Sequence, residues 1–200
     1  MKRTLGTALA GACLQLAPVP ARAHLVTTGI GPVYDGIAHL FVSFEDMLPV
    51  IAIALLAGLN GPRAGRWMLF TLPIAWLLGG VAGTLVPVTP LQVGPAALSL
   101  LAIGALAAAD FRLGPTTVTA LALALGIVHG WQNGVALATA GLKATGLVGT
   151  ATAVFVVAAL VAALVVALRQ PWTRIAVRVA GSWIGATGLL LLGWTLSGRA

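Results

Sequence analysis

Charged residues are scarce in this chain of 200 residues. Only 8% of the residues are Asp, Glu, Lys or Arg, whereas 60% are hydrophobic and the mean hydropathy is +1.05. A soluble domain usually carries about 25% charged residues, which keep its surface in water. This shortage excludes a soluble globular domain and predicts a chain whose surface mostly contacts the lipid bilayer.

Cysteine is almost absent, since Cys13 is the only one. It lies in a segment that we expect to be removed, so the mature protein would have no disulfide and no thiolate metal ligand. Basic residues outnumber acidic ones by 11 to 4, but they are scattered singly between apolar runs. We therefore expect no nucleic-acid binding, which requires a basic patch or stripe.

Residues 1–23 have the pattern of a secretory signal peptide. Lys2 and Arg3 form its basic start, residues 4–16 are apolar, and an Ala-x-Ala sequence ends at Ala23. Cleavage there would leave His24 as the mature amino terminus, on the periplasmic side of a bacterial inner membrane. An uncleaved first helix is the alternative.

The remaining residues, 24–200, form long apolar runs with Gly and Pro at the joints. A helix needs about 20 apolar residues to cross a bilayer, and continuous rather than alternating runs favour helices over a β-barrel. The sequence predicts an all-α fold, a single polytopic bundle of about six transmembrane helices. The expected spans are 33–59, 66–86, 91–109, 115–138, 145–168 and 173–196.

The basic residues indicate the orientation of these spans. With the mature amino terminus outside, the inside loops and the inner end of the last span hold six arginines, and the outside holds only Lys143 and Arg199. An excess of basic residues is typical of cytoplasmic loops. The orientation predicts that the carboxyl terminus is periplasmic, like the mature amino terminus. The inside arginines are Arg63, Arg66, Arg112, Arg169, Arg174 and Arg178. Asp110, close to one of them in the same loop, is expected to be solvated.

Glycines recur at helical spacing in two spans, as Gly79-Gly80-x-x-Gly83 and Gly181-x-x-x-Gly185. Small residues let membrane helices approach closely, so we expect these glycines to serve packing.

The first expected span contains three of the four acidic residues, Asp35, Glu45 and Asp46, together with His39. Burying a carboxylate in lipid costs several kcal/mol, so such residues usually face a partner or a watery cavity. On one continuous helix, Asp35, His39 and Asp46 would form a stripe, with Glu45 about a quarter turn away. Pro49 follows and could kink the helix beside this stripe.

The fourth expected span carries the other polar group. His129 and Asn133 are four residues apart and share a helix face, with Gln132 alongside, while Gly130 and Gly134 allow close packing. Both polar groups should lie at the same depth in the membrane, which predicts one shared site between the two helices. Imidazoles with carboxylates suit a divalent first-row metal ion. A proton relay and a purely structural hydrogen-bond network are the alternatives.

These segments resemble the HupE/UreJ family of hydrogenase and urease accessory membrane proteins. Residues 35–39 (D-G-I-A-H) are similar to the family's D-G-x-x-H segment, and residues 45–48 (E-D-M-L) stand where it usually reads D-H-L-L. Residues 126–130 (G-I-V-H-G) resemble its second histidine motif. The resemblance implies a membrane permease for nickel or cobalt that supplies hydrogenase or urease maturation. The imidazoles and carboxylates themselves would also suit zinc or manganese. The resemblance places His39, Asp46 and His129 at the family's motif positions.

The main hypothesis is therefore a six-span transporter for a divalent transition-metal ion, which is not an enzyme. The ion would be collected near His24 and Asp35, then coordinated by His39, Asp46 and His129, with Glu45, Gln132 and Asn133 assisting. Relative to the family pattern, Asp46 and Asn133 replace histidines, and oxygen donors favour harder ions. Two other hypotheses are a membrane-embedded metal-dependent hydrolase with Glu45 as general base and a non-transporting accessory protein.

Overall fold

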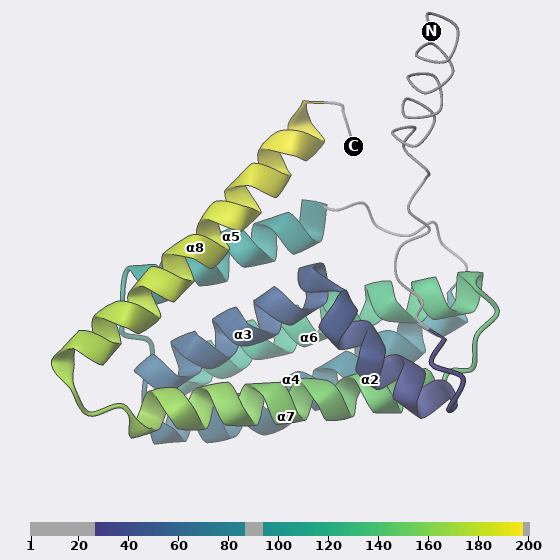
Figure 1. Ribbon diagram of the computed structural model, residues 1–200, viewed down its shortest axis with the longest axis horizontal. Coiled ribbons are helices and arrows are strands. Elements are labelled where there is room, and N and C mark those ends of the chain that lie inside the picture. The colour runs from purple at the N-terminus through teal and green to yellow at the C-terminus, as the bar shows by residue number, and fades with distance from the viewer. Residues whose placement is uncertain (1–26, 87–93, 198–200) are drawn as a thin grey trace, which may run out of the picture.

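The computed structural model describes residues 27–86 and 94–197, and their regular structure is entirely helical (Figure 1). The predicted all-α fold is thus confirmed, whereas the predicted signal peptide and His24 lie outside the described residues. The helices are α2 (Pro32–Val42), α3 (Phe44–Leu59), α4 (Pro62–Leu85), α5 (Gly94–Ala108), α6 (Pro115–Thr139), α7 (Gly146–Ala167) and α8 (Pro171–Leu196).

Each of the six predicted spans corresponds to a helix or helix pair. Helices α4, α6, α7 and α8 are long and apolar enough to cross a membrane, and α2 with α3 forms one further candidate span. Helix α5 has 15 residues, fewer than the roughly 17–25 of a usual transmembrane helix. The described residues therefore contain four or five helices or pairs that meet the criteria for a span, plus this shorter apolar helix.

The first predicted span is not one continuous helix, and this prediction was wrong. Helices α2 and α3 meet at Ser43 with a bend of 75°. The Ser43 N–H donates to the His39 carbonyl at 2.9 Å, and the Ser43 carbonyl accepts the N–H of Asp46 at 3.0 Å. One residue thus ends α2 and begins α3, a position that serine favours because its short polar side chain competes with helical hydrogen bonds. Pro49, the expected kink, lies inside α3.

Helices α4 and α6 run parallel and pack backbone to backbone. Gly130 lies against the backbone of Trp76 and Gly134 against that of Gly80, and a Cβ at either glycine would collide with α4. The expected packing role of the α4 glycines is confirmed. These contacts fix the rotation of α6 about its own axis. Its other face, which carries His129 and Asn133, is therefore directed toward α3.

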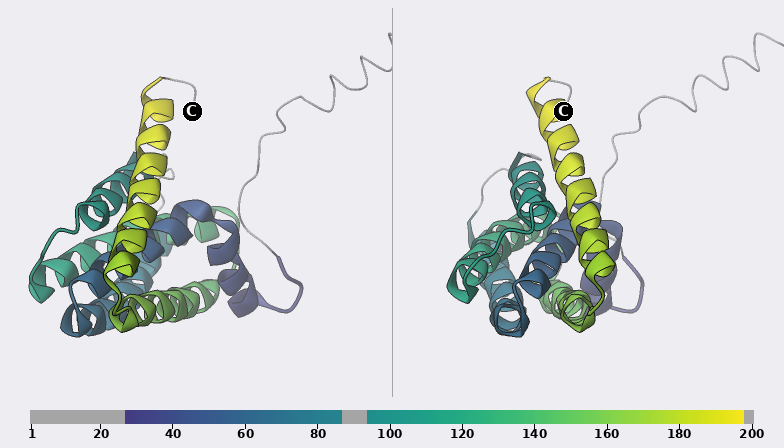
Figure 2. Two further views of the ribbon diagram at one scale, coloured as in Figure 1. Left: turned by 60° about the vertical axis from the view of Figure 1, so that its left-hand side comes forward. Right: turned by 90° about the vertical axis from the view of Figure 1, so that its left-hand side faces the viewer.

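Helices α5 and α8 form a second closely packed, antiparallel pair. Gly104 of α5 lies against Gly185 and Gly181 of α8, and Gly188 lies against Leu101. Figure 2 shows α8 leaning away from the other helices toward its carboxyl end. Helix α5 therefore connects this pair to the core of the bundle beside α3.

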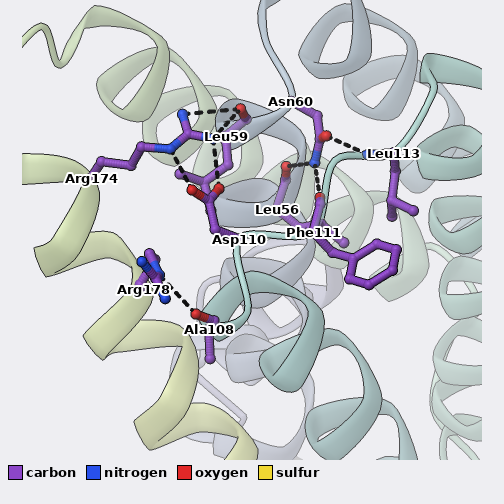
Figure 3. Close-up of polar contacts among 9 residues, drawn as sticks. All are labelled: Leu56, Leu59, Asn60, Ala108, Asp110, Phe111, Leu113, Arg174 and Arg178. Carbon is purple, nitrogen blue, oxygen red and sulfur yellow. Dashed lines mark hydrogen bonds and ion pairs between the residues drawn. The ribbon is translucent and has the colours of Figure 1, made fainter. Parts of the chain in front are cut away.

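The α3–α4, α5–α6 and α7–α8 loops meet at the end of the bundle where α3 ends and α8 begins. Figure 3 shows the first two of these loops beside the start of α8. The side-chain amide of Asn60 donates to the Phe111 carbonyl at 3.3 Å, and its oxygen accepts the Leu113 N–H at 2.7 Å. This joins the α3–α4 loop to the α5–α6 loop. The arginines that were assigned to the cytoplasmic side belong to these loops and to the adjoining helix ends, so the structure gathers them at one end.

Asp110 is partly buried rather than freely solvated, because Arg174 binds it. The guanidinium donates from Nε and Nη2 to the two carboxylate oxygens, each at 2.6 Å, and both nitrogens Nη1 and Nη2 lie 3.5 Å from the Leu59 carbonyl. Asp110 has a positive φ of 56°, a conformation that Asp tolerates better than most residues. The pair joins the start of α8 to the loop after α5, and the Leu59 contact of the same guanidinium joins it to the carboxyl end of α3.

Candidate functional site

The predicted meeting of the two polar groups occurs around the carboxylate of Asp46. His129 Nδ1 of α6 lies 2.9 Å from Asp46 Oδ1, and Asn133 Nδ2 donates to Asp46 Oδ2 at 2.8 Å. His39 Nε2 of α2 lies 3.4 Å from the same Oδ2. The bend at Ser43 allows this, because it turns the start of α3 back toward His39. We call these four residues, His39, Asp46, His129 and Asn133, the Asp46 cluster.

The hydrogen atoms in the Asp46 cluster follow from its partners. An ionised carboxylate only accepts hydrogen bonds, so the imidazole nitrogens that face Asp46 carry hydrogens. In neutral imidazoles the opposite nitrogens are then acceptors. His39 Nδ1 lies 3.3 Å from the Ser43 hydroxyl, and His129 Nε2 lies 3.0 Å from that of Ser99. The Ser43 hydroxyl can donate to His39 Nδ1, whereas the single hydrogen of the Ser99 hydroxyl is shared between His129 Nε2 and the Ala96 carbonyl, which lies 2.8 Å away.

Two residues at this site were missed by the sequence analysis, namely Ser99 and Trp76. Ser99 reaches His129 from α5, and the Trp76 ring of α4 stacks on the imidazole with centroids 5.6 Å apart and planes at 25°. Ser99 was recognisable only as an isolated polar residue in an apolar run. Trp76 gave no signal at all, because a buried aromatic residue usually belongs to the core.

The cluster is sealed from solvent except on one side. His129 is 0% exposed, and Asp46 and Asn133 are each 5% exposed. A cavity of about 260 Å³ lies beside them, between α2, α6 and the α6–α7 loop, and its lining includes Asp35, His39, Asn133 and Lys143. His39 and Asn133 therefore connect the buried carboxylate to the cavity.

The other predicted site residues differ in position. Asp35 lines the cavity, where its carboxylate accepts hydrogen bonds from the Thr28 N–H at 2.5 Å and the Thr28 hydroxyl at 2.7 Å. Glu45 is exposed on the far side of the α2–α3 junction and lines a different cavity with Thr187. Gln132 is partly buried and forms no hydrogen bond with the described residues. The structure brings neither Glu45 nor Gln132 into the cluster.

The cluster contains nitrogen and oxygen atoms of the kinds that ligate a cation, but most of them form hydrogen bonds with one another. Within residues 27–86 and 94–197, no group of three or more His, Cys, Asp or Glu is arranged as metal ligands. Asn133 Oδ1, however, is buried without a hydrogen-bond partner. Burying an unpaired carbonyl oxygen costs about 1–3 kcal/mol, and a cation next to it would remove that cost.

The fold and the site together define a multi-pass helical membrane protein with a buried carboxylate beside a cavity. The family model described as HupE / UreJ protein matches residues 12–191. The chain therefore belongs to the HupE/UreJ family. Comparison with curated proteins and with solved structures gives no match.

Proposed function

We propose that this protein is a permease that admits a divalent transition-metal ion through the membrane. The observation that carries the proposal is the Asp46 carboxylate, buried between α2, α3 and α6 and connected to a cavity by His39 and Asn133. A buried carboxylate is costly in a membrane and is usually functional. A cation arriving from the cavity would neutralise it.

The arrangement also suits release. Asp46 already has hydrogen bonds from His129 and Asn133, so the carboxylate is partly satisfied when the site is empty. A cation must compete with these bonds, which keeps its binding moderate. Conduction requires binding that is favourable enough for entry and weak enough for exit.

We further propose that nickel or cobalt is the cargo, that the protein lies in the bacterial inner membrane, and that a hydrogenase or urease maturation system receives the ion. Membership of the HupE/UreJ family supports these assignments. The arginines gathered at one end of the bundle favour a cytoplasmic position for that end. Both termini of the mature chain would then be periplasmic. The metal ion is substrate here rather than a resident cofactor.

A proton pathway is the second candidate, and one observation favours it. Ser43, His39, Asp46, His129 and Ser99 form a continuous chain of contacts of 3.4 Å or less, and such chains carry protons in membrane pumps. The hydrolase hypothesis has less support, because Glu45, its expected general base, lies outside the cluster.

Reconstitution in liposomes separates these candidates. Purified protein is placed in vesicles with a metal-sensitive dye or a pH-sensitive dye inside, and Ni²⁺, Co²⁺, Mn²⁺ and Zn²⁺ are added outside in turn. A permease gives a saturable metal signal that is lost in His39→Ala. A pH signal without any metal signal would instead establish the proton pathway and contradict the permease.

A further inference from the structure

We propose that His129 is a positioning residue that never touches the transported ion, and that Asn133 Oδ1 is a ligand in its place. The ion would then be held by His39, Asp46 and Asn133. This inference rests on the proposed function and divides the roles within the Asp46 cluster.

Both nitrogens of His129 have short contacts, Nδ1 at 2.9 Å from Asp46 Oδ1 and Nε2 at 3.0 Å from the Ser99 hydroxyl. The nitrogens of His39 have longer contacts, at 3.4 Å from Asp46 Oδ2 and 3.3 Å from the Ser43 hydroxyl, and His39 lines the cavity. A metal ligand needs an imidazole nitrogen whose lone pair faces the ion. The ring of His129 is 0% exposed, is stacked on Trp76, and is not among the residues that line the cavity. An ion in the cavity therefore has no route to either nitrogen without disrupting contacts from three helices.

The same contacts allow His129 to orient the Asp46 carboxylate without binding the ion itself. Ser99 and Trp76 hold the ring in one orientation, and the ring in turn holds one oxygen of Asp46. Residues that orient a ligand in this way usually contribute about ten- to hundredfold to metal affinity. The other carboxylate oxygen, Oδ2, contacts the two cavity-lining residues, His39 and Asn133.

Asn133 has the opposite character. It lines the cavity, it is 5% exposed, and its Oδ1 has no hydrogen-bond partner. Its amide nitrogen donates both to Asp46 Oδ2 and to the His129 carbonyl, which fixes the side chain with its oxygen directed away from those acceptors. A carboxamide oxygen is a good ligand for a divalent cation, and a cation there would remove the unpaired acceptor.

This assignment gives the ion one imidazole and two oxygen-bearing side chains. Such a shell binds harder ions, such as Mn²⁺, relatively better than a shell of two imidazoles does. The preference for nickel over manganese should therefore be smaller than two histidine ligands would produce.

X-ray absorption at the nickel edge counts the imidazoles bound to Ni²⁺ and so tests the assignment. The chain contains three histidines, so a His24→Ala background without a histidine tag leaves only His39 and His129. We expect one imidazole per Ni²⁺, still one in His129→Gln with affinity lowered about ten- to hundredfold, and none in His39→Gln. Two imidazoles in the parent, falling to one in His129→Gln, would overturn the inference and leave the permease intact.

Equilibrium binding of Ni²⁺ tests the role of Asn133 independently. Asn133→Leu should weaken binding, whereas Gln132→Leu, at a neighbouring amide that the structure leaves outside the cluster, should not. Each variant is first shown to elute as the parent does on size exclusion. Unchanged binding in folded Asn133→Leu would overturn the ligand assignment, and absence of both binding and uptake in the parent would overturn the proposed function with it.

Discussion

Asp46 Oδ1 of α3 and His129 Nδ1 of α6 lie 2.9 Å apart, although 83 residues separate them in the chain. The contact depends on two local features. The bend at Ser43 places Asp46 at the start of a new helix, and the glycines of α6 set the rotation of His129 against α4. Helix geometry thus brings together two polar groups that would each be costly in lipid alone.

Replacing Asp46 by Asn should abolish metal uptake while leaving the protein in the membrane. Asn is nearly the same size, but it removes the negative charge that the other residues of the cluster surround. The decrease in uptake should exceed the roughly ten- to hundredfold effect that is typical of a residue that only orients the metal ligands. Vesicle uptake of Ni²⁺, normalised to the amount of reconstituted protein, measures it. Uptake at the parent rate would show that the carboxylate is not required.

The sequence predicted the helices and the polar contact well, for physical reasons. Apolar runs of bilayer length give the spans, and the cost of charge in lipid indicates that Asp46 and His129 share a site. It did not predict the bend, since one serine in an apolar run is a weak signal. Glu45 was placed near the cluster because it is only about a quarter turn from the stripe, but on α3 that quarter turn leaves Glu45 exposed while Asp46 is buried.

Gly134→Ala should destabilise the protein by about 1–3 kcal/mol, the usual cost of forcing extra atoms into a packed interface. The added methyl group would collide with the Gly80 backbone. Gly193→Ala is the matched control, because a Cβ there meets nothing within 4 Å and Ala favours a helix by up to about 1 kcal/mol. Thermal unfolding in detergent should move in opposite directions for the two variants, and equal shifts would contradict the packing of α4 on α6.

The Asp110–Arg174 pair should contribute modestly to stability and little to transport. The Arg174 side chain is 41% exposed, so solvent screening limits the coupling to about 1 kcal/mol or less. A double-mutant cycle with Arg174→Ala and Asp110→Asn measures it, since Asn tolerates the positive φ at this position. Loss of Ni²⁺ uptake in Arg174→Ala at normal protein abundance would show that this end of the bundle takes part in transport.

Blocking the cavity should stop uptake. Leu142 lines the cavity, whereas Leu196, the last residue of α8, is 79% exposed away from it. In a Cys13→Ala background the chain has no other thiol, so Leu142→Cys can be labelled selectively with a bulky, membrane-impermeant reagent. Labelling from the periplasmic side should abolish uptake for Leu142→Cys and leave Leu196→Cys unaffected. Equal uptake in both labelled variants would place the entry route elsewhere.

The position of a bound ion tests the account most directly. Crystals grown in lipid and soaked with Ni²⁺ would reveal it by anomalous scattering at the nickel edge. We predict a peak at the floor of the cavity, within coordination distance of Asp46 Oδ2 and next to His39 and Asn133. A dominant peak elsewhere, with the Asp46 cluster unchanged and no nickel beside it, would contradict the claim that this carboxylate receives the ion.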